Sequence, residues 1–283
     1  RDVERSRGLG DVYKRQKNFM WTTNFNFAYN NNKILKEALR EDALEPGREG
    51  YPVGALFALK TAGLDEEGYP MFEGKDGKAV SAMEFFKLQE WGFGATDLTA
   101  RERRELYTYV GTADCPYTGG FNNTFTYKAF ELGVNFSFDF GGKVRSQPTY
   151  SIVDFDKGRN TNRDILNRWT PENTETIFPV LLSQNERLDE YMWYSNQNEI
   201  YRNLDIWIRD LNYVRLQNIR LGYTLPTNFS RKLGMTSATI AIEGRNLLVF
   251  GSSYKNYLDP ETMSNAYATP APKSVTLSLN LNF

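Results

Sequence analysis

Histidine and cysteine, two side chains much used for nucleophilic and metal chemistry, are almost absent from this 283-residue chain. There is no histidine, which removes histidine-ligated metals, Ser–His and Cys–His nucleophile pairs, and the commonest general base. The single cysteine, Cys115, allows neither a disulfide framework nor a cysteine metal cluster, and a small buried or turn residue is its simplest interpretation. These residue types therefore predict no catalytic or metal site.

Carboxylates are the next candidates for chemistry. Asp154 and Asp156 begin like a calcium-binding loop, but Ile165 stands where a bidentate Glu would have to close it. A glycoside hydrolase, which is one alternative class, would need two carboxylates that face one cleft, and the sequence cannot show such a pair. Glu131 and Asp139 are explained by the polar side of one strand. We therefore expect no catalytic residue, no metal and no cofactor, and a protein that is not an enzyme.

The charge pattern does not indicate a nucleic-acid partner. The formal net charge is -1, with 34 Lys and Arg against 35 Asp and Glu. Arg101, Arg103 and Arg104 follow a capping-box start, with Glu102 three residues after Thr99. Acidic residues are interleaved with these arginines, so a solvated helix face is a better interpretation than a basic patch.

The last stretch of the chain, 273–283, alternates strictly between apolar and polar residues. Such a strand has one apolar face, which could meet either a protein core or lipid. Its ending on Phe after alternate apolar positions looks like the signal that the outer-membrane assembly machinery recognises in bacterial β-barrels. The residues that would form this membrane-assembly signal are Val275, Leu277, Leu279, Leu281 and Phe283.

The same alternation recurs along the chain, and aromatic residues make up 14% of it, which suits the aromatic girdles of a membrane barrel. Gly141 and Gly142 are expected to turn the chain after a strand rich in Phe. We predict an all-β fold: an antiparallel transmembrane β-barrel portion of about nine strands, an open curved sheet, with short helices in long extracellular loops. The expected strands are 19–29, 53–61, 106–110, 121–127, 130–140, 143–153, 211–223, 238–250 and 273–283.

Connection lengths support a barrel portion. The long connections 62–104, 154–209 and 251–272 all fall at one end of the expected sheet, and 31–52 is an exception at the other end. Outer-membrane barrels have this asymmetry, with long loops outside and short turns in the periplasm. An odd number of strands predicts that the chain does not close a barrel by itself.

Residues 1–16 read RDVERSRGLGDVYKRQ and show neither periodicity nor a signal-peptide layout. An ordinary polar turn is one interpretation, and sequence that is not native is the other. The domain prediction therefore treats 1–17 as a non-native or disordered leader and 18–283 as the barrel portion.

Several stretches together resemble one transporter family, the SusC/RagA-type TonB-dependent transporters. They include YVRLQNIRLGYTLP at 213–226, IEGRNLLVF at 242–250, the terminal strand, GYPVGALFALKTAGLD at 50–65, LNRW at 166–169, and the run from 109 to 143. The resemblance extends from about residue 18 onward, in matching order, and corresponds to the carboxy-terminal part of the β-barrel only.

This resemblance implies a multi-pass β-barrel in the outer membrane of a Bacteroidota species, embedded in outer-membrane lipid. Family members import glycans or peptides, work with a SusD-like surface lipoprotein, and are energised through TonB, ExbB and ExbD. Their complete barrels have about 22 strands around a plug. This chain shows neither a plug nor a TonB box, so contact with TonB is expected through an amino-terminal part that it does not contain.

The resemblance suggests roles for polar and aromatic side chains. The amides of Asn24, Asn26, Asn135, Asn280 and Asn282 would give the lumen a hydrated wall. Aromatic residues in a long loop could stack on substrate or pack against the SusD-like lid, although ordering of their own loop is the simpler interpretation. These loop residues are Trp169, Tyr191, Trp193, Tyr194 and Trp207. A soluble secreted β-sandwich that binds a ligand or an adhesion partner is the alternative, and it predicts shorter strands in two packed sheets.

Overall fold

The computed structural model describes residues 6–16, 18–89, 96–146, 157–160, 163–181, 202–251, 259–262 and 268–283. The chain forms two compact units. The first unit comprises Arg1–Asn32, Ala113–Gly142 and Asp210–Phe283, and the second comprises Lys33–Thr112 and Lys143–Arg209. No helix in the described part of the chain is long and apolar enough to cross a membrane.

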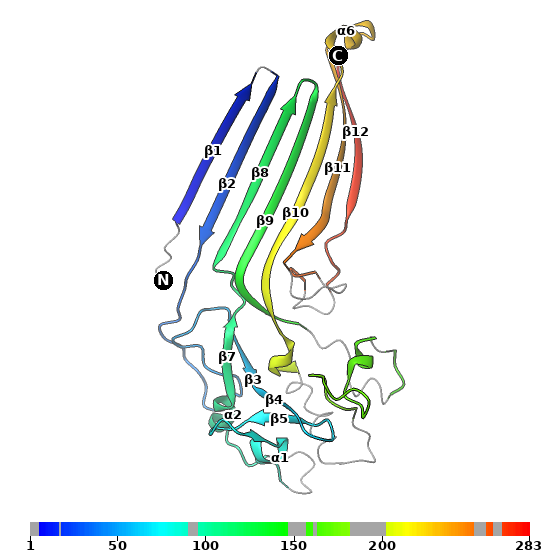
Figure 1. Ribbon diagram of the computed structural model, residues 1–283. Helices are drawn as coiled ribbons and strands as arrows, with labels where there is room; N and C mark the ends of the chain where they lie inside the picture. The colour runs from blue at the N-terminus through cyan, green and yellow to red at the C-terminus, as the bar shows by residue number, and fades with distance from the viewer. Residues whose placement is uncertain are drawn as a thin grey trace. The chain divides into compact units, whose positions relative to one another are not determined.

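The first unit is built on a seven-stranded antiparallel sheet that stays open (Figure 1). Its order is β1 (Ser6–Gln16), β2 (Phe19–Tyr29), β8 (Tyr117–Tyr127), β9 (Phe130–Arg145), β10 (Ile208–Thr224), β11 (Ser237–Phe250) and β12 (Ser274–Asn282). β1 and β12 are the two edges. The predicted all-β class and the open, partial barrel sheet are confirmed.

Strand register explains why alternation produces a continuous apolar face. Phe121 of β8 lies between Phe25 of β2 and Phe136 of β9, so three aromatic residues line up across three strands. The rings of Phe25 and Phe138 stack with centroids 6.0 Å apart. Because residues two apart share a face, each paired row of this kind extends the apolar surface along the sheet.

The expected turn at Gly141–Gly142 is wrong, because β9 continues through both glycines to Arg145. Gly141 takes a positive φ of 83° and its N–H donates to Asn212 Oδ1 at 2.7 Å. A Cβ on Gly142 would come within 2.6 Å of Cys115 Sγ. The two glycines therefore permit an irregular backbone and close packing within a strand, rather than a reversal.

The second unit holds two small sheets and short helices. β3 (Ala55–Leu59) pairs with β7 (Tyr107–Thr112), and β4 (Thr61–Leu64), β5 (Pro70–Glu73) and β6 (Ala79–Val80) form the other sheet. The helices are α1 (Ala82–Phe85), α2 (Ala100–Glu105), η1 (Arg163–Asn167) and η2 (Asp205–Trp207). Its core contains Leu59, Phe72, Ala82, Phe86, Leu204 and Trp207. The expected strands near 53–61 and 106–110 thus exist but pair with each other outside the main sheet.

Strand directions separate long from short connections. The β8–β9 turn and the β10–β11 connection, which contains α6 (Thr227–Lys232), lie at one end of the sheet, and the β2–β8 and β9–β10 connections leave from the other. The long connections therefore do share an end. The sequence had suggested that 31–52 is a long connection at the short-turn end. These residues instead belong to the long β2–β8 connection, which leaves from the same end as the other long connections.

The backbone of Ser6–Gln16 forms β1, and it pairs with β2 from Ser6 opposite Tyr29 to Gln16 opposite Phe19. The lack of periodicity in residues 1–16 had predicted no strand there. That residues 1–16 are not native stays a prediction.

Candidate functional site

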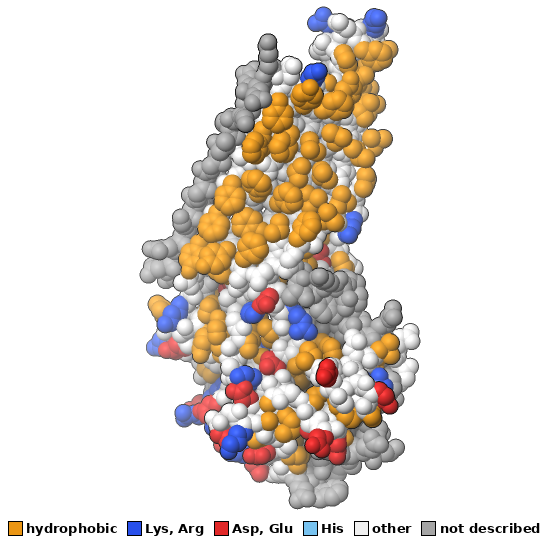
Figure 2. Space-filling view, viewed as in Figure 1, with side chains coloured by type: hydrophobic (Ala, Val, Ile, Leu, Met, Phe, Trp, Pro, Cys, Tyr) orange, Lys and Arg blue, Asp and Glu red, His pale blue; other side chains and the backbone are white. Residues whose placement is uncertain are grey.

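A broad apolar band covers one face of the seven-stranded sheet, and Figure 2 shows it in orange over the strands. Its exposed members are Phe25, Phe121, Phe130, Phe140, Leu221, Ile240, Ile242, Val275, Leu277 and Leu279. Soluble proteins rarely expose a continuous apolar surface of this kind. A β-sandwich would cover it with a second sheet. Lipid is the environment that matches it.

The residues of the expected membrane-assembly signal extend this band. Leu277 of β12 lies opposite Ile242 and Leu279 lies opposite Ile240, on the same face. Val275 and Leu277 are 68% and 76% exposed, and Leu281 and Phe283 are exposed as well. Their position suits contact with lipid, and their role as an assembly signal stays a prediction.

Aromatic residues bracket the band at both ends. Tyr29 and Tyr117 meet at one end with ring centroids 5.3 Å apart, and Phe130 and Tyr223 meet at the other at 4.7 Å. β8 carries a tyrosine at each end, Tyr117 and Tyr127, which are about 33 Å apart at a strand rise of about 3.3 Å per residue. At a tilt of about 40°, this corresponds to a height of about 25 Å, the apolar height of an outer-membrane barrel.

The opposite face of the sheet is polar and linked across strands. Asn135 Nδ2 donates to Asn218 Oδ1 at 3.0 Å, and Asn218 Nδ2 donates to Glu243 Oε1 at 2.9 Å. Glu131 forms an ion pair with Arg220 at 3.0 Å. The prediction of an amide-rich face therefore holds at Asn135. Of the other predicted amides, Asn282 donates to Ser237 Oγ at 2.7 Å.

The polar face also carries a charged network that was not predicted from the sequence. Arg215, only 2% exposed, donates through Nε to Glu261 Oε1 at 2.9 Å and forms a second ion pair with Asp259. Tyr213 donates its hydroxyl to Asp139 Oδ2 at 2.5 Å. The network fastens the segment 259–262 to the sheet. No sequence signal indicates it, because its members come from three separate stretches.

Glu131 and Asp139 do not form a catalytic pair. They stand on one strand, eight residues apart, which corresponds to about 26 Å along the strand. Paired glycosidase carboxylates lie within about 10 Å of each other. Among the described residues, no group of three or more Cys, Asp or Glu is arranged to hold a metal ion.

The loop aromatics that the sequence singled out have different positions. Trp207 is 1% exposed and packs in the core of the second unit, with its ring 5.7 Å from that of Phe178. Trp169 is half-buried, and its backbone N–H donates to the Phe178 carbonyl at 3.0 Å. The structure thus brings both tryptophans to Phe178. Tyr191, Trp193 and Tyr194 lie outside the described residues.

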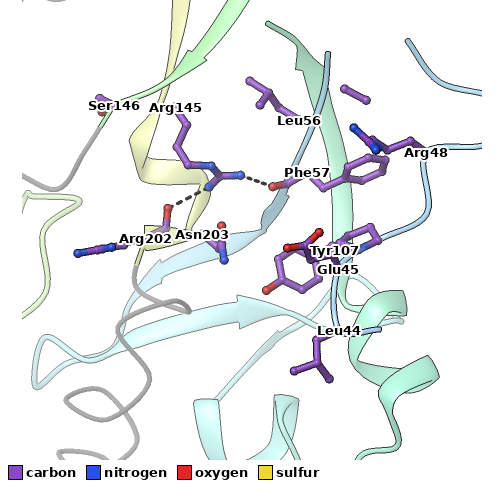
Figure 3. Close-up of a pocket in the computed structure, with 12 residues that line it drawn as sticks. Leu44, Glu45, Arg48, Leu56, Phe57, Tyr107, Arg145, Ser146, Arg202 and Asn203 are labelled. Atoms are coloured by element: carbon purple, nitrogen blue, oxygen red, sulfur yellow. Dashed lines mark hydrogen bonds between the residues drawn. The ribbon is translucent and has the colours of Figure 1, made fainter. Parts of the chain in front are cut away.

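A cavity of about 530 Å³ lies within the second unit (Figure 3). Arg145 reaches into it from the end of β9, donating to the carbonyl of Arg202 at 2.9 Å and to that of Phe57. Apolar and aromatic residues, including Leu56 and Tyr107, form part of the remaining wall, and polar or charged residues such as Glu45, Arg48 and Asn203 form the other part. No local sequence pattern predicts this cavity, because its lining comes from four separate stretches of the chain: 44–57, Tyr107, 145–146 and 202–203.

Comparison with known proteins supports the barrel interpretation, although no family model matches the chain. TonB-dependent receptor P3 of Formosa agariphila is 27% identical over 297 residues, which cover 94% of this chain and 27% of the relative. The chain resembles part of a SusC/RagA-type TonB-dependent transporter. TonB-dependent receptor P39 of the same organism is 23% identical over 95% of this chain and 29% of its own length.

Solved structures of longer proteins contain the same fold. The RagAB peptide transporter matches 97% of this chain with a TM-score of 0.67 at 22% identity, and the chain covers 28% of it. The RagAB peptide importer in its open-open state matches with a TM-score of 0.65. The chain spans between 27% and 29% of the length of these proteins. Its place is the outer membrane, as part of a multi-pass β-barrel.

Proposed function

We propose that this chain forms part of the barrel wall of an outer-membrane importer energised through TonB. The apolar band with its aromatic borders carries this proposal, because it has the height and composition of a lipid-facing barrel surface. The similarity to TonB-dependent receptors supports the transport role. The chain would serve as a wall and a binding surface rather than as an enzyme.

The polar face would line the lumen. Its cross-strand amides and ion pairs satisfy one another, as in Asn135–Asn218–Glu243 and Glu131–Arg220, and leave a hydrated surface along which a polar substrate can pass. The substrate class that we propose is glycans or peptides. The likeness to a protein described as a peptide transporter supports the second of these.

The long connections would face the cell exterior, where a SusD-like lipoprotein would cover the substrate. The short turns would face the periplasm. TonB, ExbB and ExbD would act through parts of the importer that this chain does not contain.

Placing an arginine on each face of the sheet tests the lipid-facing assignment. Phe136 lies opposite Phe121 within the apolar band, whereas Thr124 lies on the polar face opposite Gly133. In the complete transporter, Phe136→Arg should lower the free energy of unfolding by about 2–4 kcal/mol near the bilayer midplane. Thr124→Arg, the matched control, should cost much less because its charge stays in water.

Folding into lipid vesicles, followed by denaturant titration and by the heat-dependent gel mobility of the barrel, measures both variants. Equal losses for the two variants would contradict the lipid-facing assignment, and so would an unchanged stability of Phe136→Arg.

A further inference from the structure

We propose that the cavity of the second unit binds a carboxylate group, with the Arg145 guanidinium as its anchor. The inference rests on the proposed import function only for the source of the ligand. The binding chemistry follows from the cavity itself.

The charge of Arg145 lacks an acidic partner among the described residues. Its side chain is half-buried, and both of its hydrogen bonds go to neutral main-chain carbonyls, those of Arg202 and Phe57. Taking a cation out of water without a counter-charge is costly. An anion bound in the cavity would offset that cost.

The geometry of a guanidinium favours a carboxylate. Arg carries five N–H donors in a planar fork, and two N–H groups suffice for its bonds to the two carbonyls. Those that remain can meet the two oxygens of a carboxylate in a bidentate contact.

The anchor is held in place before any ligand arrives. The two carbonyls fix the guanidinium, and the next residue, Ser146, is fastened to the core through its N–H and its hydroxyl. Both donate to the carbonyl of Trp207, at 2.9 Å and 3.0 Å. A side chain that is already ordered loses little conformational entropy when a ligand binds.

The other charges around the cavity favour a group with a single negative charge. Arg48 is already paired with Glu37 at 3.3 Å, and Arg202 is exposed to solvent. Glu45 lines the cavity and repels each negative charge on the ligand, so a dianion is disfavoured more strongly than a single carboxylate. A carboxylate therefore fits better than a phosphate dianion.

The cavity is larger than a carboxylate needs, so the group would arrive attached to something else. A volume of about 530 Å³ is within the range of ligand pockets. Phe57 forms part of the wall, and its ring is braced edge-on by Tyr51 at 5.2 Å and Tyr109 at 5.8 Å. This apolar wall suits either a peptide side chain or the face of a sugar ring. The carboxy terminus of a peptide and a uronic acid of a glycan share the required chemistry.

Binding to the complete, detergent-solubilised transporter tests the proposal and separates the two sources. The probes are tetra-alanine, tetra-alanine amide, tetragalacturonate and its methyl ester, each measured by calorimetry. At least one free carboxylate should bind, and its neutral counterpart should bind at least about tenfold more weakly. The peptide and sugar pairs then identify which source the site prefers.

Three variants connect this binding to the cavity. Arg145→Gln should weaken carboxylate binding about tenfold, the factor that corresponds to about 1.4 kcal/mol. Arg209→Gln is the matched control, because Arg209 also donates to two main-chain carbonyls, those of Ile206 and Ile208, but does not line the cavity. Glu45→Gln should strengthen binding several-fold by removing a repulsion, a gain that misfolding could not produce.

Equal binding by Arg145→Gln and Arg209→Gln would overturn the proposal. So would the absence of binding by both carboxylates, or equal affinity for charged and neutral probes. The binding test and the arginine-insertion test can fail separately. If the protein binds carboxylates but Phe136→Arg leaves its stability unchanged, the Arg145 site stands and the lipid-facing assignment is wrong.

Discussion

Glu102 closes a capping box at the first turn of α2. Its carboxylate accepts from the Thr99 backbone N–H at 2.9 Å and from Lys87 Nζ at 3.0 Å. These hydrogen bonds lower the pKa of Glu102 from 4.5 to about 2, and the bond from the Thr99 N–H contributes most. The contacts that depend on its charge thus persist well below the pH at which an ordinary glutamate is protonated.

The pH dependence of this capping box follows from the lowered pKa. Because the folded-state pKa lies below the unfolded one, unfolding takes up a proton between about pH 4.5 and 2. The contribution of Glu102 to stability should be complete above pH 4.5 and should disappear as the pH falls toward 2. Carboxyl chemical shifts in an NMR titration measure this directly. Lys87→Met should raise the pKa of Glu102, and a value near 4.5 in both proteins would contradict the capping role.

At the scale of elements, period-two alternation predicted the strands that build the main sheet. β2, β9, β11 and β12 lie close to the expected stretches, because a strand with lipid on one face and water on the other must alternate. Alternation does not say which strands pair. The segment at 53–61 therefore looked like a barrel strand, although β3 pairs with β7 in a separate sheet.

Sites built by side chains from distant stretches were beyond the reach of the sequence. Gly141–Gly142 has the composition of a turn, and only the packing of Gly142 against Cys115 shows why glycine is needed within a strand. The Arg215 network and the Arg145 cavity depend on tertiary contacts between segments more than 40 residues apart. No local pattern records such contacts.

The helix α6 should lie in the lipid headgroup region at the short-turn end of the sheet. Phe229 and Leu233, four residues apart and 53% and 58% exposed, share one side of it, and Arg231 and Lys232 supply positive charge. The strand that follows it, β11, carries exposed apolar residues of the band, such as Ile240, so we expect this apolar side to continue the lipid-facing surface.

A tryptophan at each of two adjacent positions tests the placement of α6. In vesicles of brominated phospholipid, Phe229→Trp should add fluorescence that the lipid quenches strongly. Asn228→Trp, on the exposed residue next to it, should add fluorescence that is quenched much less. Weak quenching at both positions would place the helix in water.

At the scale of the whole molecule, the two ends of the sheet differ in what they carry. Short connections occupy one end, namely the turn at Lys128–Ala129 and the segment 225–236 that contains α6. Together these two connections contain three basic residues and no acidic residue. The opposite end gives rise to the residues that fold into the second unit, including its small sheets and the Arg145 cavity. A ligand-binding unit serves an importer only where substrate arrives, so this end should face the cell exterior.

Epitope tags in the complete transporter test this orientation on living cells. One tag is inserted at Gly77, in an exposed turn of the second unit with open space around it, and the other at the Lys128–Ala129 turn. Both sites are turns between paired strands, where insertions are tolerated best.

An antibody added to intact cells should bind only the tag at Gly77, because the outer membrane shields the periplasmic turns. Permeabilised cells should expose both tags, which controls for expression and folding. Labelling of intact cells through the Lys128–Ala129 tag alone would invert the orientation and would place the carboxylate site on the side from which imported substrate leaves.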